Sequence, residues 1–180
     1  MVYSYSGGVA VQQKTYSAGN YDAVYYATYY IPETLRKVTL TNYTTTRFAF
    51  YGCSMLSEIT LSSKTSIIGE MAFYNCKNLT KVNMPNPIKQ IGDKAFYGCF
   101  KLEEIILDKV LNKIGADSFT NCSSLKKVYF HGDESTWKNI SISTTGNLEL
   151  MNSDKFYYSE LEPTIEGNYW HYKDDIITIW

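Results

Sequence analysis

Apolar residues recur at a fixed interval through the middle of the chain. Between Ala49 and Phe130, like residues fill the same positions every 23 residues. Five such columns share one phase, and they contain Phe50, Phe73, Phe96 and Phe119; Cys53, Cys76, Cys99 and Cys122; Leu56, Leu79, Leu102 and Leu125; Ile59, Val82, Ile105 and Val128; and Leu61, Met84, Leu107 and Phe130. A unit this short cannot bury its own apolar face, so successive units are expected to stack into a solenoid with one continuous core.

The columns also predict the local structure of each unit. The spacing of Leu56, Ile59 and Leu61 is typical of a short strand whose apolar side points inward. Upstream of it, pairs such as Ala95–Phe96 predict a single turn of helix. Only Gly or Asn precedes the four cysteines, and because both adopt a left-handed backbone at low cost, this position is predicted to end the turn. These residues are Gly52, Asn75, Gly98 and Asn121, and a second bend is expected at Gly69, Gly92 and Gly115.

At these residues the chain resembles a known family, the leucine-rich repeats of the bacterial surface-antigen type, also called BspA-like or Treponema pallidum-type. The family's unit reads roughly I-G-x-x-A-F-x-x-C-x-x-L-x-x-I-x-L-P. The matching residues of one unit are Ile91–Gly92, Ala95–Phe96, Cys99, Leu102, Ile105 and Leu107. The resemblance implies a right-handed leucine-rich-repeat solenoid, β-rich with one short helical turn per repeat. It also implies a role in surface binding or adhesion, without implying a ligand.

Two regions without repeats flank the array. The repeats are expected to occupy residues 35–130 as five rungs, the first formed by Leu35, Val38 and Leu40. A solenoid leaves its first rung open, so residues 1–34 are predicted to form an irregular or β-rich amino-terminal cap. Residues 131–180 are predicted to form a carboxyl-terminal cap, in which Asp133 or Ser135 begins a short helix and Trp137 closes the core.

Tyrosine is unusually frequent, with 17 in the chain, and eight of them lie in residues 1–34. Tyrosine suits both exposed strands and recognition surfaces, so its abundance does not choose between the two. A tyrosine-lined binding surface is therefore the alternative to a simple cap in residues 1–34.

The four cysteines are expected to be free. Residues one repeat apart should stack about 4.8 Å apart with parallel side chains, which keeps neighbouring Cβ atoms too far apart for a disulfide. Zinc is less expected still, because the cysteines form a line rather than a tetrahedral cluster. Buried, structural thiols are the prediction.

The strand residues that point away from the core form two further columns. The first alternates in charge and contains Lys37, Glu58, Lys81, Glu104 and Lys127. Each neighbouring pair should contribute about 0.2–1 kcal/mol, which favours a self-paired ladder over a ligand site. The second column becomes apolar toward its carboxyl end, where an exposed Ile106 beside Tyr129 is a candidate anchor for a ligand. The predicted binding face comprises Lys81, Asn83, Glu104, Ile106, Lys127 and Tyr129.

The last residues, 168–180, are predicted to form a β-hairpin. Two strand-like runs, residues 169–172 and 176–180, flank Lys173-Asp174-Asp175, a plausible tight turn. The segment is similar to a terminal aromatic hairpin in repeat proteins of this family from gut-dwelling Gram-positive bacteria. It is expected to act as a cap or as a joint to a following domain. The alternative is an aromatic platform for a glycan or peptide, built on Trp170, Tyr172 and Trp180.

Composition narrows the range of partners. With 17 basic and 18 acidic residues the chain is nearly neutral, so no nucleic-acid partner is expected. No apolar run is long enough to span a bilayer, so membrane insertion is not expected either. Met1 is not followed by a charged segment and an apolar core. The resemblance therefore implies a secreted or cell-surface protein whose signal peptide is already removed, with a cytoplasmic protein as the alternative. A monomer is expected.

The sequence lacks the constellations typical of an enzyme. It contains no phosphate loop, dinucleotide fingerprint, nucleophile elbow or zinc-helix motif. The two histidines, His131 and His171, are expected to be partly exposed strand residues rather than catalytic bases or metal ligands. No enzymatic activity, cofactor or metal is expected. The predicted function is a non-catalytic binding module that recognises a protein or glycan through the strand face, in adhesion or host interaction. The alternative is a structural spacer or display scaffold within a larger surface protein.

Overall fold

The computed structural model describes residues 12–20, 23–31, 35–40, 47–84 and 87–180. Near the amino terminus, β1 (Gln12–Asn20) and β2 (Ala23–Ile31) pair in antiparallel fashion. The side chains of these two strands and residues 1–11, 21–22 and 32–34 lie outside the described part of the chain. The amino-terminal cap and the tyrosine-lined surface therefore stay predictions.

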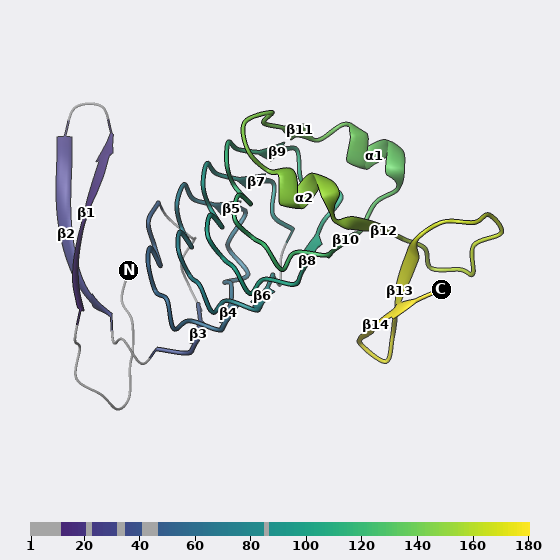
Figure 1. Cartoon of the computed structure of the whole chain (residues 1–180), viewed down its shortest axis with the longest axis horizontal. Coiled ribbons are helices and arrows are strands. Elements are labelled where there is room, and N and C mark those ends of the chain that lie inside the picture. The colour runs from purple at the N-terminus through teal and green to yellow at the C-terminus, as the bar shows by residue number, and fades with distance from the viewer. Residues whose placement is uncertain (1–11, 21–22, 32–34, 41–46, 85–86) are drawn as a thin grey trace.

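From residue 35 onward the chain forms the predicted leucine-rich-repeat solenoid, with a row of short strands on each of two sides (Figure 1). One side carries β3 (Lys37–Thr39), β4 (Glu58–Thr60), β6 (Lys81–Asn83), β8 (Glu104–Leu107), β10 (Lys127–Phe130) and β12 (Asp154–Tyr158). The other side carries β5 (Ile67–Ile68), β7 (Gln90–Ile91), β9 (Lys113–Ile114) and β11 (Ser141–Ile142). Every hydrogen-bonded pair within these two rows is parallel. The fifth and last rung was expected to end at Phe130, but the row of strands continues beyond it through β12.

The five apolar columns form the core between the two rows of strands. The four phenylalanines of one column, Phe50, Phe73, Phe96 and Phe119, are fully buried. Their rings stack with successive centroid distances of 5.6, 5.2 and 5.3 Å. Equal steps along the sequence thus become equal positions in successive coils, as the 23-residue period predicts.

The cysteine column is buried and free of disulfides at all four positions. The sulfur atoms of Cys76, Cys99 and Cys122 donate to the carbonyl oxygens of Phe50, Phe73 and Phe96, at 3.1, 3.2 and 3.1 Å. Burial raises the pKa of Cys122 to about 12 and the pKa of Cys99 well above its ordinary value. Because the thiolate is the reactive form, these thiols should be chemically inert in the folded protein.

A thiol titration should reveal this burial. In the native protein at mildly alkaline pH, a thiol reagent should react slowly, because the raised pKa values and the closed core both limit access to the thiolate. In denaturant without reductant, the same reagent should count the four free cysteines. Rapid native labelling, or a count below four after unfolding, would contradict the stacked column.

The segment between the two rows of strands differs from the predicted helical turn. It is a run of hydrogen-bonded turns, and residues 47–53, 70–76, 92–99 and 115–122 contain no helix. The predicted left-handed position is confirmed, with φ of 64°, 56°, 70° and 62° at Gly52, Asn75, Gly98 and Asn121. A second left-handed column, which the sequence did not indicate, prevents a helix from forming. It contains Phe48, Met71, Lys94 and Asp117, with φ between 51° and 57°.

These turns are hydrogen-bonded to one another along the solenoid. In one coil the N–H groups of Met71, Phe73 and Asn75 donate to the carbonyl oxygens of Asp93, Ala95 and Tyr97 in the next coil, at 2.9, 2.8 and 2.7 Å. Every second residue of the turns therefore donates a backbone hydrogen bond to the next coil, as every second residue of a strand does in a parallel sheet. The expected second bend is a point of close approach, since a Cβ on Gly92 would lie 2.6 Å from the backbone nitrogen of Glu70.

In the last run of turns, residues 115–122, the N–H of Asp117 still donates to a backbone carbonyl, that of Thr145, at 2.9 Å. Side chains replace the next two carbonyl groups. The N–H of Phe119 donates to Oδ1 of Asn147 at 3.0 Å, and the N–H of Asn121 donates to Oε1 of Glu149 at 2.7 Å. Asn147 is fully buried and begins α2 (Leu148–Asn152). Its Nδ2 donates to the carbonyl oxygens of Gly115 and Ser143, so both ends of the amide are bonded. This arrangement caps the carboxyl-terminal end of the ladder of turns.

The rest of the carboxyl-terminal region contains the predicted helix and hairpin. Asp133 caps α1 (Glu134–Lys138) by accepting the N–H of Thr136, and Trp137 is buried with its ring 5.3 Å from that of Phe130. The hairpin consists of β13 (Tyr169–Lys173) and β14 (Ile176–Ile179), joined by a turn with left-handed residues at Asp174 and Asp175. Because β13 pairs in parallel with β12, the hairpin extends the row of strands begun by the repeats.

Candidate functional site

The predicted strand face is divided between β6 and β8. The strands β3, β4 and β6 form one sheet, and β8, β10, β12, β13 and β14 form another. No pairing joins β6 to β8 in the described residues, although β7 and β9, on the other side of the same two coils, remain paired. Neighbouring coils therefore separate on one side only.

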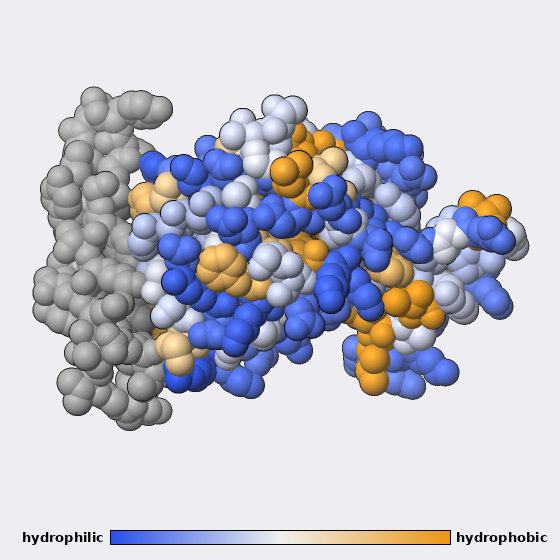
Figure 2. All heavy atoms as spheres, viewed as in Figure 1, coloured by the Kyte–Doolittle hydropathy of each residue, from blue (hydrophilic) through white to orange (hydrophobic). Residues whose placement is uncertain are grey.

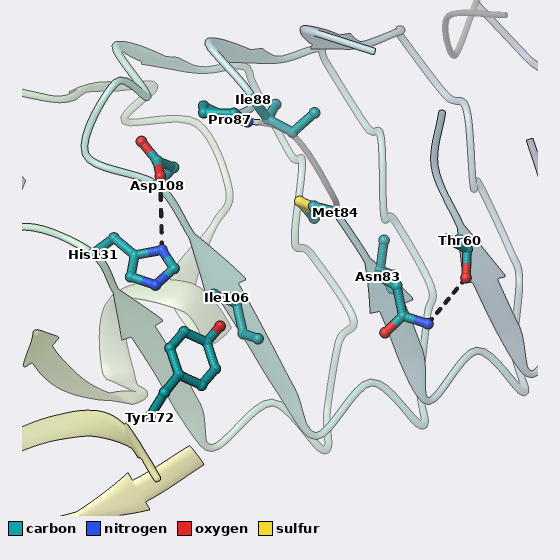
Figure 3. A pocket seen from close by; sticks show the side chains of 10 residues that line it. Thr60, Asn83, Met84, Pro87, Ile88, Ile106, Asp108, His131 and Tyr172 are labelled. Atoms are coloured by element: carbon teal, nitrogen blue, oxygen red, sulfur yellow. Dashed lines mark hydrogen bonds and ion pairs between the residues drawn. The ribbon is translucent and has the colours of Figure 1, made fainter. Parts of the chain in front are cut away.

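A groove with a volume of about 440 Å³ lies at this separation, and we call it the β6–β8 groove (Figure 3). Its apolar lining consists of Val82, Met84, Pro87, Ile88 and Ile106. Its polar lining consists of Thr60, Asn83, Asp108, His131 and Tyr172. Val82 and Ile88 are only 8% and 3% exposed, so the core itself backs the groove.

Two of the predicted site residues, Asn83 on β6 and Ile106 on β8, line the groove. The Nδ2 of Asn83 donates to Oε1 of Glu58 at 3.2 Å and to Oγ1 of Thr60 at 3.1 Å. Figure 3 shows this amide nitrogen turned toward Thr60 and the amide oxygen turned away from it. Asn83 therefore offers a ligand a hydrogen-bond acceptor rather than a donor.

The charged residues of the predicted face lie outside the groove lining. Lys81, Glu104 and Lys127 occupy the alternating column, and the strand register places Lys127 opposite Glu104 and Asp154. Of the ion pairs expected along this column, Lys37–Glu58, at 2.8 Å, is the one within 4.0 Å in the described residues. The charged residues of this column therefore lie opposite one another on neighbouring strands, but only Lys37 and Glu58 of the column form an ion pair among the described residues.

The prediction that Tyr129 is an exposed anchor is wrong. Its side chain is buried, with only 3% of its surface exposed. Its ring lies 5.4 Å from that of Phe156 and 5.5 Å from that of Trp170. Phe156 from β12 and Trp170 from the hairpin cover this tyrosine. A second, smaller core of Tyr129, Phe156 and Trp170 results.

The alternative aromatic platform is only partly available for the same reason. Trp170 is fully buried and its Nε1 donates to the carbonyl oxygen of Phe130 at 3.1 Å. Tyr172 is 43% exposed and reaches the groove, while Trp180 is 44% exposed, with its ring tilted against that of His171 at 3.9 Å between centroids. Figure 2 shows hydrophobic surface over the hairpin. The exposed apolar residues of this region include Ile176 in the hairpin and Leu161 and Ile165 in the loop before it.

Asp108 and His131 belong to the groove although the sequence reading did not select Asp108 and placed His131 outside any site. Each directly follows a strand, β8 or β10, and the two residues are 23 apart. Nδ1 of His131 lies 3.7 Å from Oδ2 of Asp108, while Oδ1 of Asp108 accepts the N–H of Val110 at 3.0 Å. The repeat period itself was the signal that could have paired them.

The surroundings of His131 favour its neutral form. The rings of Trp170, Tyr158 and Tyr172 lie 4.8, 5.4 and 5.8 Å from its ring. Burial lowers the pKa of His131, and the charge of Lys109 acts in the same direction, against the opposing effect of Asp108. The groove is therefore lined by a carboxylate and a neutral imidazole at neutral pH.

The described residues contain no cluster of three or more His, Cys, Asp or Glu side chains that could hold a metal ion. None of the helices in the described part of the chain is long and apolar enough to cross a membrane. What the geometry offers is a concave apolar surface with a few fixed hydrogen-bonding groups.

Comparison with known proteins places the fold. The BspA-type leucine-rich repeat region matches residues 43–160 in six copies, whereas no curated protein matches the chain. Among solved structures, the leucine-rich repeat protein of T. pallidum is 22% identical, with a TM-score of 0.58 over 82% of this chain and 68% of that one. A leucine-rich cell surface protein of Faecalibacterium prausnitzii is 24% identical, with a TM-score of 0.50 over 73% of this chain and 41% of that one. Because the family match covers more than half of its residues, the chain belongs to the BspA-type leucine-rich repeat family.

Proposed function

We infer that the chain is a binding domain of a secreted or cell-surface bacterial protein and that it recognises a polypeptide partner through the β6–β8 groove. The observation that carries this proposal is the groove itself, about 440 Å³ in volume, where two strands separate while the rest of their coils stays paired. Ligand sites in proteins are typically concave, largely apolar and about 300–1,000 Å³ in volume. A non-catalytic role in adhesion or host interaction is part of the proposal.

The walls of the groove support this role because the fold already holds them in place. Val82, Ile88 and Met84 pack against the main core, and Ile106 packs against the smaller core of Tyr129, Phe156 and Trp170. A site whose walls are fixed before binding loses little conformational entropy when it is filled. The surface location is supported by the family and by the Faecalibacterium protein, which is described as a cell surface protein.

A structural spacer within a longer protein is the competing proposal. The Faecalibacterium chain favours it, because the present chain covers only 41% of that length. A spacer would need the stacked core but would make no use of the groove.

Selection from a displayed library of random peptides tests the binding role. The variant Ile106→Trp fills the groove, and Ile67→Trp makes the same change at a 46% exposed position on β5, on the other side of the solenoid. Peptides enriched on the wild-type chain should lose about tenfold or more in affinity for Ile106→Trp and keep their affinity for Ile67→Trp. Circular dichroism of both variants checks that each remains folded, and Tyr172→Ala provides a second groove variant.

Two results would count against the proposal. Failure to enrich any peptide that is sensitive to the groove variants would favour the spacer. The second result is that no peptide binds but glycans on an array do, and that this glycan binding is lost in Ile106→Trp and in Tyr172→Ala. The groove would then still be the binding site, but its ligand would be a carbohydrate rather than a polypeptide.

A further inference from the structure

The described lining of the β6–β8 groove carries a net negative charge. Of its described lining residues, Asp108 is the one with a formal charge at neutral pH, because burial keeps His131 neutral. The carboxylate side chain of Asp108 is 27% exposed, so it is half-buried in the groove wall. A ligand that enters the groove must therefore either pair with this carboxylate or strip water from it.

The carboxylate of Asp108 and the amide of Asn83 present hydrogen-bond acceptors in the groove. Oδ1 of Asp108 accepts one backbone N–H, while Oδ2 is 3.7 Å from Nδ1 of His131, beyond an ordinary hydrogen bond. Both N–H groups of the Asn83 amide point to Glu58 and Thr60, which leaves its oxygen as an acceptor. None of the described lining residues is positively charged at neutral pH, and their side-chain donors are the hydroxyl groups of Thr60 and Tyr172 and one N–H of the neutral His131.

Aromatic and aliphatic walls complete this pattern. The exposed ring of Tyr172 comes from the hairpin toward His131 and Ile106, as Figure 3 shows. Met84, Ile88 and Ile106 supply apolar surface in the same groove. A cation on an aliphatic stem fits both surfaces, because the stem packs on apolar groups and the charge is attracted to a carboxylate and to an aromatic face.

We propose that the β6–β8 groove binds the side chain of an arginine residue in its polypeptide partner. The guanidinium group pairs with Oδ2 of Asp108, and the aliphatic stem packs on the apolar lining of the groove. Arginine fits better than lysine because its planar group makes several directed hydrogen bonds and also stacks on aromatic rings. Acidic side chains are excluded by repulsion from Asp108. This assignment rests on the proposed polypeptide-binding function of the same groove.

Peptides enriched in the display experiment provide the test. They should share an arginine at one fixed position, and replacing that arginine by citrulline, which has nearly the same shape but no charge, should weaken binding about tenfold or more. Asp108→Asn should abolish the preference for arginine over citrulline. The matched control, Asp154→Asn, removes an exposed carboxylate from β12 in the same sheet and should leave the preference intact.

The outcomes separate this inference from the function beneath it. Peptides that lose affinity for Ile106→Trp but carry no shared arginine, or that respond equally to Asp108→Asn and Asp154→Asn, would overturn the arginine site and leave the binding groove standing. Absence of any peptide sensitive to Ile106→Trp would overturn both. Loss of the arginine preference in Asp108→Asn alone supports both.

Discussion

Replacing Phe96 with alanine should lower the free energy of unfolding by about 3–5 kcal/mol. Phe96 is fully buried, and its ring lies between those of Phe73 and Phe119 at 5.2 and 5.3 Å. Its removal leaves a cavity in the middle of a continuous stack, where the two neighbouring coils are held apart by their own backbone hydrogen bonds and cannot close the space. Denaturant unfolding of the wild-type chain and the variant measures the loss.

The matched control for this change is Phe100→Ala. Phe100 is four residues further along the same coil and is 41% exposed, so the same atoms are removed from a position outside the core. Phe100→Ala should lower the free energy of unfolding by less than about 1 kcal/mol. Equal losses for Phe96→Ala and Phe100→Ala would mean that the phenylalanine column is not the centre of the fold.

Replacing Asn147 with glycine should cost about 3 kcal/mol or more. The buried N–H of Phe119 and the carbonyl of Ser143 lose their side-chain partners, and each such loss costs about 1–3 kcal/mol. Glycine is the informative replacement because Asn147 has a φ of 64°, so alanine would add backbone strain to the loss of hydrogen bonds. The free energy of unfolding is again the measurement.

Asn121→Gly makes the same change at a similar backbone angle, since Asn121 has a φ of 62°. Asn121 is exposed, and only its backbone N–H takes part in the cap. Its replacement should change the free energy of unfolding by less than about 0.5 kcal/mol. A comparable loss at both positions would show that the backbone angle, rather than the amide side chain of Asn147, stabilises the end of the solenoid.

The repeating part of this fold could be predicted from the sequence because every coil contacts mainly its neighbours. A residue such as Phe96 or Cys99 therefore meets the same surroundings as its equivalents one period away, and a column in the sequence becomes a column in space. The left-handed positions at Asn75 and Gly98 were predictable for a similar reason, since residue type limits backbone angle. Met71 and Lys94 adopt the same region without any sign in their chemistry.

The groove could not be predicted in the same way. Lys81 and Glu104 are spaced like the paired residues Glu58 and Lys81, so nothing in the period marks the separation of β6 from β8. The burial of Tyr129 depends on how the hairpin packs, and that packing involves Phe156 and Trp170, which lie outside the periodic columns. Contacts made by a segment without a period need the three-dimensional structure.

The side-chain cap formed by Asn147 and Glu149 can bind only the carboxyl-terminal end of the ladder of turns. Each coil presents N–H groups toward the carboxyl end, and the cap accepts two of them, from Phe119 and Asn121, while Asn147 donates to the backbone carbonyl of Gly115. Any coil with the same backbone path would therefore fit against it, whatever side chains it displays outward. Duplication of whole 23-residue units upstream of Ser118 would lengthen the protein without a new ending, so evolution could adjust the reach of this molecule by copying rather than by redesign.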